Sequence, residues 1–80
     1  MYYVYILTST ARPFHYVGLT HDLRRRIDEH FNGMTPVTKG YRPLMLVWYC
    51  VFEDKLRAAA FERYLKSGSG RAFSKKRLIP

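Results

Sequence analysis

Five polar residues of this chain belong to types that can do phosphate chemistry, and they follow one another in separate predicted elements. Two tyrosines stand in strand-like segments, an arginine and a histidine stand four residues apart in a helical segment, and a glutamate stands in a later helix: Tyr5, Tyr16, Arg26, His30 and Glu62. Hydrolysis of a phosphodiester requires an activated water, stabilisation of charge on the phosphoryl oxygens and help for the leaving oxygen. Side chains of these types can supply those needs.

The role open to each residue follows from its functional group. A single carboxylate such as Glu62 can hold Mg²⁺, because magnesium keeps several waters and takes further ligands from phosphate. Arg26 can grip a phosphate with its planar guanidinium. A tyrosine can act as general base only if cations lower its pKa from about 10. His30 lies one turn from Arg26 on the same side, where it can shuttle a proton or bind phosphate.

Each of these residues also has an ordinary structural interpretation. Tyrosines of a small sheet commonly pack half-buried. Glu62 precedes Lys66 by four residues, a helical ion pair of roughly 0.3–0.5 kcal/mol. Arg26 and His30 can form a solvated helix flank. Taken singly, the tyrosines and Glu62 need no function, so their joint order has to carry any functional hypothesis.

Three strands are expected to carry or support these residues. Residues 2–8 and 15–20 are rich in aromatic and β-branched side chains and predict an antiparallel hairpin closed by a loop over 9–14. Residues 44–52, which read LMLVWYCVF, predict a strand covered on both faces.

Two longer helices are expected between and after the strands. Residues 22–32 predict a helix with an apolar stripe of Leu23, Ile27 and Phe31, and Gly33 ends it. Arg26 and His30 fall on the flank of that stripe and face the sheet. Residues 34–43 read as a loop. A second helix is expected from Asp54 to Lys66, with an inner side that consists of Leu56, Ala59, Ala60 and Tyr64.

The C-terminal residues predict a short basic helix over 71–78. Residues 67–70 are interpreted as a helix stop with Ser69 as the next cap, in preference to a phosphate cradle. The expected order is therefore β-β-α-β-α-α in a single domain over 1–80. The class is α/β (α+β), with a small, mostly antiparallel three-stranded sheet flanked by helices.

Composition limits the partners. Fourteen lysines and arginines against six aspartates and glutamates give a net charge of +8, which favours nucleic acid over a merely solvated basic surface. Cys50 is the only cysteine, so we expect no internal disulfide, no cysteine zinc site and no disulfide-linked partner, but a buried thiol in a reducing cytoplasm. The histidine spacing indicates no metal site. No apolar run approaches the ~20 residues of a membrane span. A cytoplasmic monomer without a membrane partner is expected.

The motifs resemble a known family. Tyr3-Val4-Tyr5 followed by Tyr16-Val17-Gly18 resembles the paired motif of the GIY-YIG nucleases. Residues 22–30 look like the family's helix with an arginine and then a histidine, and Ala60-Phe61-Glu62-Arg63 looks like its metal-binding glutamate helix. Residues 64–73 are similar to the stand-alone, single-domain branch of UPF0213-like endonucleases.

The resemblance implies an endonuclease that uses Mg²⁺ or Mn²⁺ to hydrolyse phosphodiester bonds in DNA. Structured, damaged or single-stranded DNA in repair or recombination is the implied substrate, with RNA as a further possible partner. Tyr5 would be the general base and Tyr16 would orient water or phosphate, while Arg26, His30 and Glu62 complete the site and Glu62 holds the metal. A non-catalytic nucleic-acid-binding module on the same fold is the alternative.

Further residues are expected to contact nucleic acid. Gly18 would let the backbone approach closely, and the others would contribute charge: Arg24, Arg25, Lys39, Arg71, Lys75 and Lys76. The chain departs from the family pattern at two points. Tyr3 stands where the motif's name has glycine, and no asparagine follows Glu62, so Ser69 or Ser74 is the candidate to replace its contacts.

Overall fold

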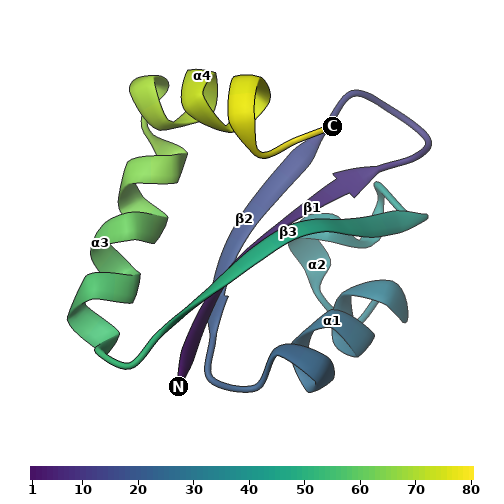
Figure 1. The fold of residues 1–80 in the computed structure, drawn as a ribbon. Coiled ribbons are helices and arrows are strands. Elements are labelled where there is room, and N and C mark those ends of the chain that lie inside the picture. Colours follow the sequence, from purple (N-terminus) through teal and green to yellow (C-terminus); the bar gives the residue numbers. More distant parts are fainter.

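A three-stranded antiparallel sheet lies between two pairs of helices (Figure 1). The computed structural model describes residues 1–80. Its elements follow in the order β1 (Tyr2–Ser9), β2 (His15–Thr20), α1 (Leu23–Phe31), α2 (Pro36–Lys39), β3 (Leu44–Phe52), α3 (Lys55–Lys66) and α4 (Gly68–Arg77). The strands lie in the spatial order β2-β1-β3. The predicted α+β class and the β1–β2 hairpin are confirmed.

The helix α2 lies inside a segment that the sequence predicts as loop, and that prediction was wrong. Pro36 begins the helix, a position where the N–H that proline lacks would have no partner in any case. The helix spans only Pro36–Lys39, too short for an apolar period to show. It nevertheless buries Thr38 completely beside α1.

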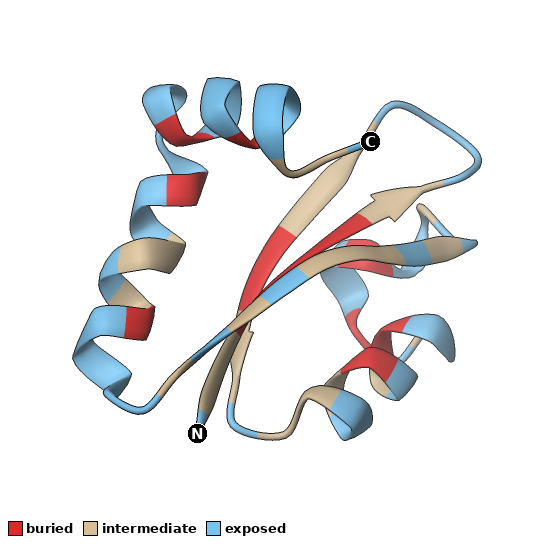
Figure 2. Cartoon of the chain, viewed as in Figure 1, coloured by how far each residue is buried: buried red, intermediate tan, exposed pale blue.

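One face of the sheet carries an apolar core beneath α3 and α4. Its fully or nearly fully buried members come from β1, β2 and α3: Val4, Ile6, Val17, Ala58 and Leu65. Larger half-buried side chains such as Trp48, Phe52 and Phe61 surround this cluster. Figure 2 shows the buried positions along β1 and β2 and on the inward sides of the helices. Alternate residues of β1 point to this face, as the two-residue period of a strand requires.

The opposite face of the sheet has fewer buried apolar side chains and lies beneath α1 and α2. Tyr5, Leu7 and Ile27 form its buried cluster, with Leu23, Leu44 and Leu46 packed against it. Because Tyr5 and Leu7 alternate with Val4 and Ile6 along β1, the central strand supplies both cores. Tyr5, Tyr16, Arg26 and His30 belong to this second face, whereas Glu62 lies on α3, above the other one.

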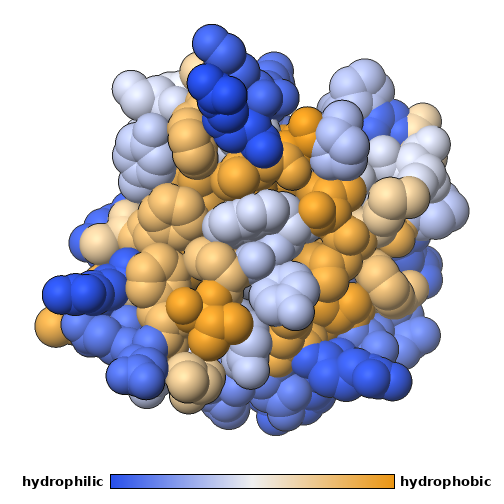
Figure 3. All heavy atoms as spheres, in the orientation of Figure 1, coloured by the Kyte–Doolittle hydropathy of each residue, from blue (hydrophilic) through white to orange (hydrophobic).

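The strand β3 lies at an edge of the sheet and none of its side chains is fully buried, so the prediction that it is covered on both faces was wrong. Met45, Tyr49 and Val51 remain 51%, 52% and 46% exposed. Figure 3 shows apolar side chains gathered in the middle of this view, with hydrophilic residues around them. Cys50 is half-buried instead of buried, and it is a free thiol. An unbroken apolar run therefore did not require two covered faces here.

The inner sides of two helices differ from the expectation. In α3, Leu56 and Tyr64 are 78% and 42% exposed, and Ala58 and Leu65 are buried in their place. Successive residues of a helix point about 100° apart. If the buried stripe is assigned one or two residues away from its true position, exposed residues are taken for buried ones. In α1, Phe31 is 43% exposed while His30 is fully buried.

The last helix begins three residues earlier than predicted, at Gly68 instead of 71. Ser67, not Ser69, is its N-cap, and its Oγ accepts a hydrogen bond from the Gly70 N–H at 3.1 Å. Gly70 lies against the carbonyl of Tyr64, where an added Cβ would overlap the backbone. The sharp α3–α4 turn therefore depends on a single serine and a glycine.

Candidate active site

The phenol of Tyr5 lies at the centre of the candidate site. Tyr5 is on the central strand and is only 1% exposed. Its Oη lies 2.8 Å from Nε2 of His30, which α1 carries toward the sheet. The rings of Tyr5 and Tyr16 have centroids 6.3 Å apart, and those of Tyr16 and His30 lie 5.1 Å apart. Three residues that are distant in sequence thus form one aromatic cluster.

Gly18 makes room for this arrangement. It pairs with Tyr5 across the β1–β2 hairpin, and an added Cβ would overlap the phenol ring of Tyr5. Gly18 is itself buried. The expectation that its missing side chain admits a DNA backbone is therefore wrong, because the ring of Tyr5 occupies that space.

His30 is held at both ring nitrogens. Besides the bond to Tyr5, its Nδ1 lies 2.8 Å from Oγ1 of Thr38, and both residues are fully buried. Burial lowers the pKa of His30, the nearby Arg26 lowers it further, and Glu29 acts in the opposite direction. The imidazole is therefore neutral at neutral pH. Thr38 was not foreseen, because a threonine in a presumed loop carries no signal of its own.

Arg26 lies beside the phenol at the border of the core. Its side chain is 33% exposed, and Nη1 donates to Oε1 of Glu29 at 2.9 Å. That bond raises the pKa of Arg26, so the guanidinium stays charged. Only part of its five-donor fork is used by Glu29. Tyr5 accepts a further hydrogen bond from Arg26, and the donors that neither residue uses can meet an anion.

The pKa of Tyr5 is raised to about 12. Burial is the largest cause and Tyr16 adds to it, Arg26 opposes the shift, and the Glu62 carboxylate raises the pKa slightly further. The sequence led us to expect cations to lower this pKa, but the desolvation of the ring outweighs Arg26. Tyr5 is accordingly protonated at neutral pH and has a proton to donate.

Glu62 interacts with Lys66 on its own helix and also affects the phenol of Tyr5. Its Oε2 lies 3.1 Å from Nζ of Lys66, which is the helical ion pair that the sequence suggested. Its carboxylate is also close enough to Tyr5 to raise the phenol's pKa. The side chain is 20% exposed. The Glu62 carboxylate therefore acts electrostatically on the phenol of Tyr5 while it is paired with Lys66 on its own helix.

The donor set fits a hard divalent cation. No group of three or more His, Cys, Asp or Glu side chains is arranged to hold a metal. The Glu62 carboxylate offers oxygen ligands, which hard divalent cations prefer. Glu62 is the residue that would hold such an ion, together with waters and a phosphate.

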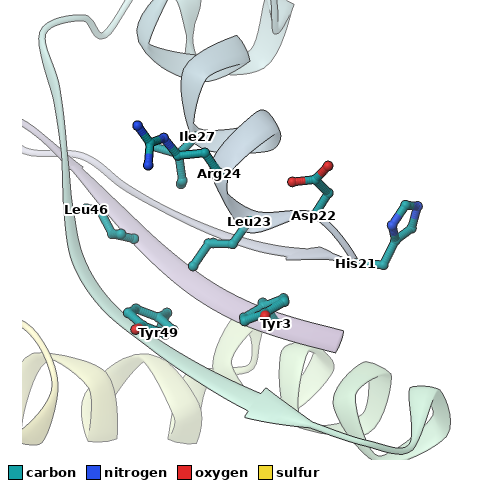
Figure 4. A pocket seen from close by; sticks show the side chains of 8 residues that line it. All are labelled: Tyr3, His21, Asp22, Leu23, Arg24, Ile27, Leu46 and Tyr49. Atoms are coloured by element: carbon teal, nitrogen blue, oxygen red, sulfur yellow. The ribbon is translucent and has the colours of Figure 1, made fainter. Parts of the chain in front are cut away.

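The predicted nucleic-acid contacts fall into separate regions. Arg71 and Lys75 line a cleft of about 620 Å³ between the β1–β2 loop and α4. Arg24 lines a different cavity of about 440 Å³ beside Tyr3, Leu46 and Tyr49 (Figure 4). Neither Tyr5 nor Tyr16 borders that second cavity.

The other predicted contacts do not line either cavity. Arg25 lies 3.9 Å from Glu29 and is 61% exposed. Lys39 is exposed at the end of α2, and Lys76 is exposed on α4. Among the predicted basic residues, only Arg71 and Lys75 line the cleft that leads toward the tyrosines.

The two serines considered as replacements for the missing asparagine behave differently. Ser74 is fully buried and its Oγ donates to the carbonyl of Gly70 at 2.8 Å, so it is committed to the helix. This excludes Ser74 from the role. Ser69 is exposed on the first turn of α4.

None of the helices has the length and apolar character needed to cross a membrane.

Known proteins with similar sequences share one designation. The UPF0213 protein of Vibrio campbellii is 36% identical over 64 residues, which are 79% of this chain and 61% of that protein. The UPF0213 protein of Clostridium perfringens is 40% identical over 67 residues, which are 82% of this chain and 71% of that protein. The chain thus spans about three fifths to seven tenths of the length of these relatives. No solved structure is significantly similar to it.

The order of motifs, the tyrosine–histidine cluster and the acidic residue on α3 agree with a match over almost the whole chain. Residues 1–77 match the model of the GIY-YIG catalytic domain, and the chain belongs to the GIY-YIG nuclease superfamily.

Proposed function

We propose that this chain is a divalent-metal-dependent endonuclease that hydrolyses phosphodiester bonds in DNA. The observation that carries the proposal is the cluster of Tyr5, Tyr16, Arg26 and His30, with the Glu62 carboxylate acting on the same phenol. A purely structural cluster would not need a charged guanidinium and a carboxylate beside a buried phenol. Mg²⁺ or Mn²⁺ held by Glu62 would supply positive charge that offsets the charge of the phosphoryl oxygens.

The chain's own residues divide the remaining work. The free donors of Arg26 bind the phosphate that is to be cleaved. Tyr16, half-buried beside Tyr5, positions the attacking water or the phosphate. We assign the general base to the Tyr5–His30 pair and not to a phenolate.

A pKa of about 12 leaves the Tyr5 phenol protonated at rest, so it cannot take a proton without passing one on. Its Oη lies within hydrogen-bond distance of Nε2 of His30, which is neutral and can accept. The attacking water therefore gives its proton to Oη as the phenol's own proton moves to Nε2. With its own proton on Nδ1, His30 donates to Thr38, which keeps Nε2 open as an acceptor.

A non-catalytic nucleic-acid-binding module is the second candidate. The Glu62–Lys66 ion pair favours it, because a carboxylate that is satisfied by a lysine needs no metal. The two candidates predict the same binding to DNA and opposite results in a cleavage assay.

The deciding experiment compares cleavage and binding in matched variants. Plasmid, single-stranded and branched DNA are incubated with Mg²⁺, with Mn²⁺ or with a chelator. We expect metal-dependent nicking by the wild type that falls at least about 100-fold in Glu62→Gln and in Arg26→Ala. DNA binding should survive in Glu62→Gln.

The control is Glu53→Gln, which makes the same charge change on an exposed residue outside the site. If the wild type and all three variants bind DNA alike and none of them cuts, the endonuclease proposal fails and the binding module stands. Equal cleavage by wild type and Glu62→Gln would remove Glu62 from the metal site.

A further inference from the structure

The cleft between the β1–β2 loop and α4 is strongly cationic. Arg12, His15, Arg71 and Lys75 all line it, together with small and apolar residues. None of the chain's six aspartate and glutamate side chains is among its lining residues. Arg71 and Lys75 form no ion pair, whereas Arg26 and Lys66 are each paired with a glutamate. A cleft of this size with unmatched positive charge is built for an anion.

Arg12, one of the two arginines of this cleft, is held in place before any ligand arrives. Nη2 of Arg12 donates to the carbonyl of Gly40 at 2.6 Å. Its guanidinium carbon lies 4.6 Å from the centroid of the Tyr41 ring, and Tyr41 stacks on Phe14 with centroids 3.7 Å apart. Binding by a side chain that is already ordered loses less conformational entropy. Arg12 is therefore a preorganised anion-binding residue and not a loose surface charge.

The cleft continues toward the tyrosine cluster. His15 and Arg71 also line a smaller neighbouring cavity of about 190 Å³, which Tyr16 and Lys66 line as well. His15 directly precedes Tyr16 on β2. Arg71 and Lys75 lie near enough to His15 to lower its pKa, after the larger effect of burial. The two cavities thus adjoin at His15 and Arg71, and the smaller one reaches Tyr16.

We propose that this cleft is a phosphate-binding subsite that holds the backbone of the DNA strand beyond the phosphate at Tyr5 and Arg26. The inference rests on the proposed function, since it gives the cleaved strand its path. Arg12, Arg71 and Lys75 bind the phosphates, and His15 lies at the passage to the site. The contacts are to the backbone, so they carry no sequence preference.

The test measures binding without cleavage. A fluorescent single-stranded oligonucleotide is titrated with Lys75→Gln, Arg71→Gln and the double variant in chelator over a series of salt concentrations. We expect about three- to tenfold weaker binding for each single variant at low salt. The slope of log K against log salt should fall by about 0.7 for each lost phosphate contact. The effects of Arg71→Gln and Lys75→Gln should add in the double variant.

Lys55→Gln is the matched control, because it removes the same charge from an exposed position at the start of α3. It should bind within about twofold of the wild type, since only a diffuse charge is lost. Lys76→Gln changes the neighbour of Lys75 on α4 outside the cleft, and its effect should be smaller than that of Lys75→Gln. If Lys75→Gln and Arg71→Gln bind no worse than Lys55→Gln, the subsite does not exist.

A second readout keeps this inference separate from the proposed function. With cleavable DNA and metal, the cleft variants should raise KM and leave kcat within about twofold, because they do not touch the reacting phosphate. A protein that cuts no DNA but loses binding in the cleft variants overturns the endonuclease proposal and keeps the subsite. A protein that cuts DNA with equal KM in the wild type and all cleft variants keeps the endonuclease proposal and overturns the subsite.

Discussion

The two faces of the sheet are built from the same central strand but by different chemistry. Beneath α3 and α4, β1 contributes Val4 and Ile6 to a cluster that contains only apolar side chains. Beneath α1 and α2, the alternate residue Tyr5 begins a buried polar chain through His30 to Thr38. Apolar packing tolerates small shifts, whereas a buried polar chain requires a partner for every donor and acceptor. The difference indicates that the first face holds the fold, while the second holds the site residues other than Glu62, which α3 carries.

The largest effect on stability is expected on the apolar face. Leu65→Ala should lower the free energy of unfolding by about 2–5 kcal/mol, because Leu65 is fully buried and its truncation leaves a cavity. Urea denaturation followed by circular dichroism measures it. Leu56→Ala on the same helix is the control and should cost less than about 0.5 kcal/mol, since Leu56 is 78% exposed. Cleavage per folded molecule should be unchanged in both variants, and a selective loss in Leu65→Ala would break the division between the faces.

The contact between Gly18 and Tyr5 tests the other face. In Gly18→Ala the new methyl group overlaps the phenol ring, so the ring must move and the bond to His30 is lost. We expect a loss of about 1–3 kcal/mol in stability and at least about tenfold in DNA cleavage. Gly68→Ala is the matched control, because nothing lies within 4 Å of its added Cβ. Unchanged cleavage in Gly18→Ala would mean that the position of the phenol does not matter.

Thr38 sharpens the comparison, because it touches only His30 in the polar chain. Thr38→Val keeps the shape but leaves Nδ1 of buried His30 without a partner, at a cost of about 1–3 kcal/mol. Cleavage should fall and its pH profile should shift, since the proton of His30 is no longer fixed on Nδ1. Thr38→Ser should restore both the profile and the rate. Equal profiles in Val and Ser variants would reduce Thr38 to a packing residue.

The smallest expected effect is on alkaline stability. The folded pKa of Tyr5 is about 12, against about 10 for a free phenol. Since the pKa of Tyr5 is higher in the folded state, the protonated phenol contributes to the free energy of unfolding below pH about 10. This contribution is lost as the pH rises toward 12. Between pH 8 and pH 11 the wild type should lose about 1 kcal/mol more than Tyr5→Phe. Urea unfolding at the two pH values measures the difference. Equal losses in the wild type and Tyr5→Phe would show that burial does not raise the pKa of the Tyr5 phenol.

Much of the fold could be predicted because strands, helices and helix ends depend on residues that are close together in the sequence. The aromatic and β-branched composition of β1 and β2 and the composition of the longer helices are local features, as are Asp22 and Asp54, which cap α1 and α3. The inner face of α3 could not be predicted in the same way, since Ala58 and Leu56 differ by half a turn and only the sheet decides which one it covers. The helix α2 is too short for a helical repeat of apolar residues to be visible in the sequence.

The sequence by itself determined which functional groups are present and in what order: two phenols, a guanidinium, an imidazole and a carboxylate, on elements that it also specifies. Only the tertiary structure decided that Gly18 serves Tyr5, that Thr38 holds His30, and that Arg12 and Lys75 share one cleft. It also decided the direction of the Tyr5 pKa, because burial of the ring outweighs the cation beside it. Spacing along a chain sets which side of its own element a residue occupies, whereas desolvation and hydrogen-bond partners depend on what packs against that side.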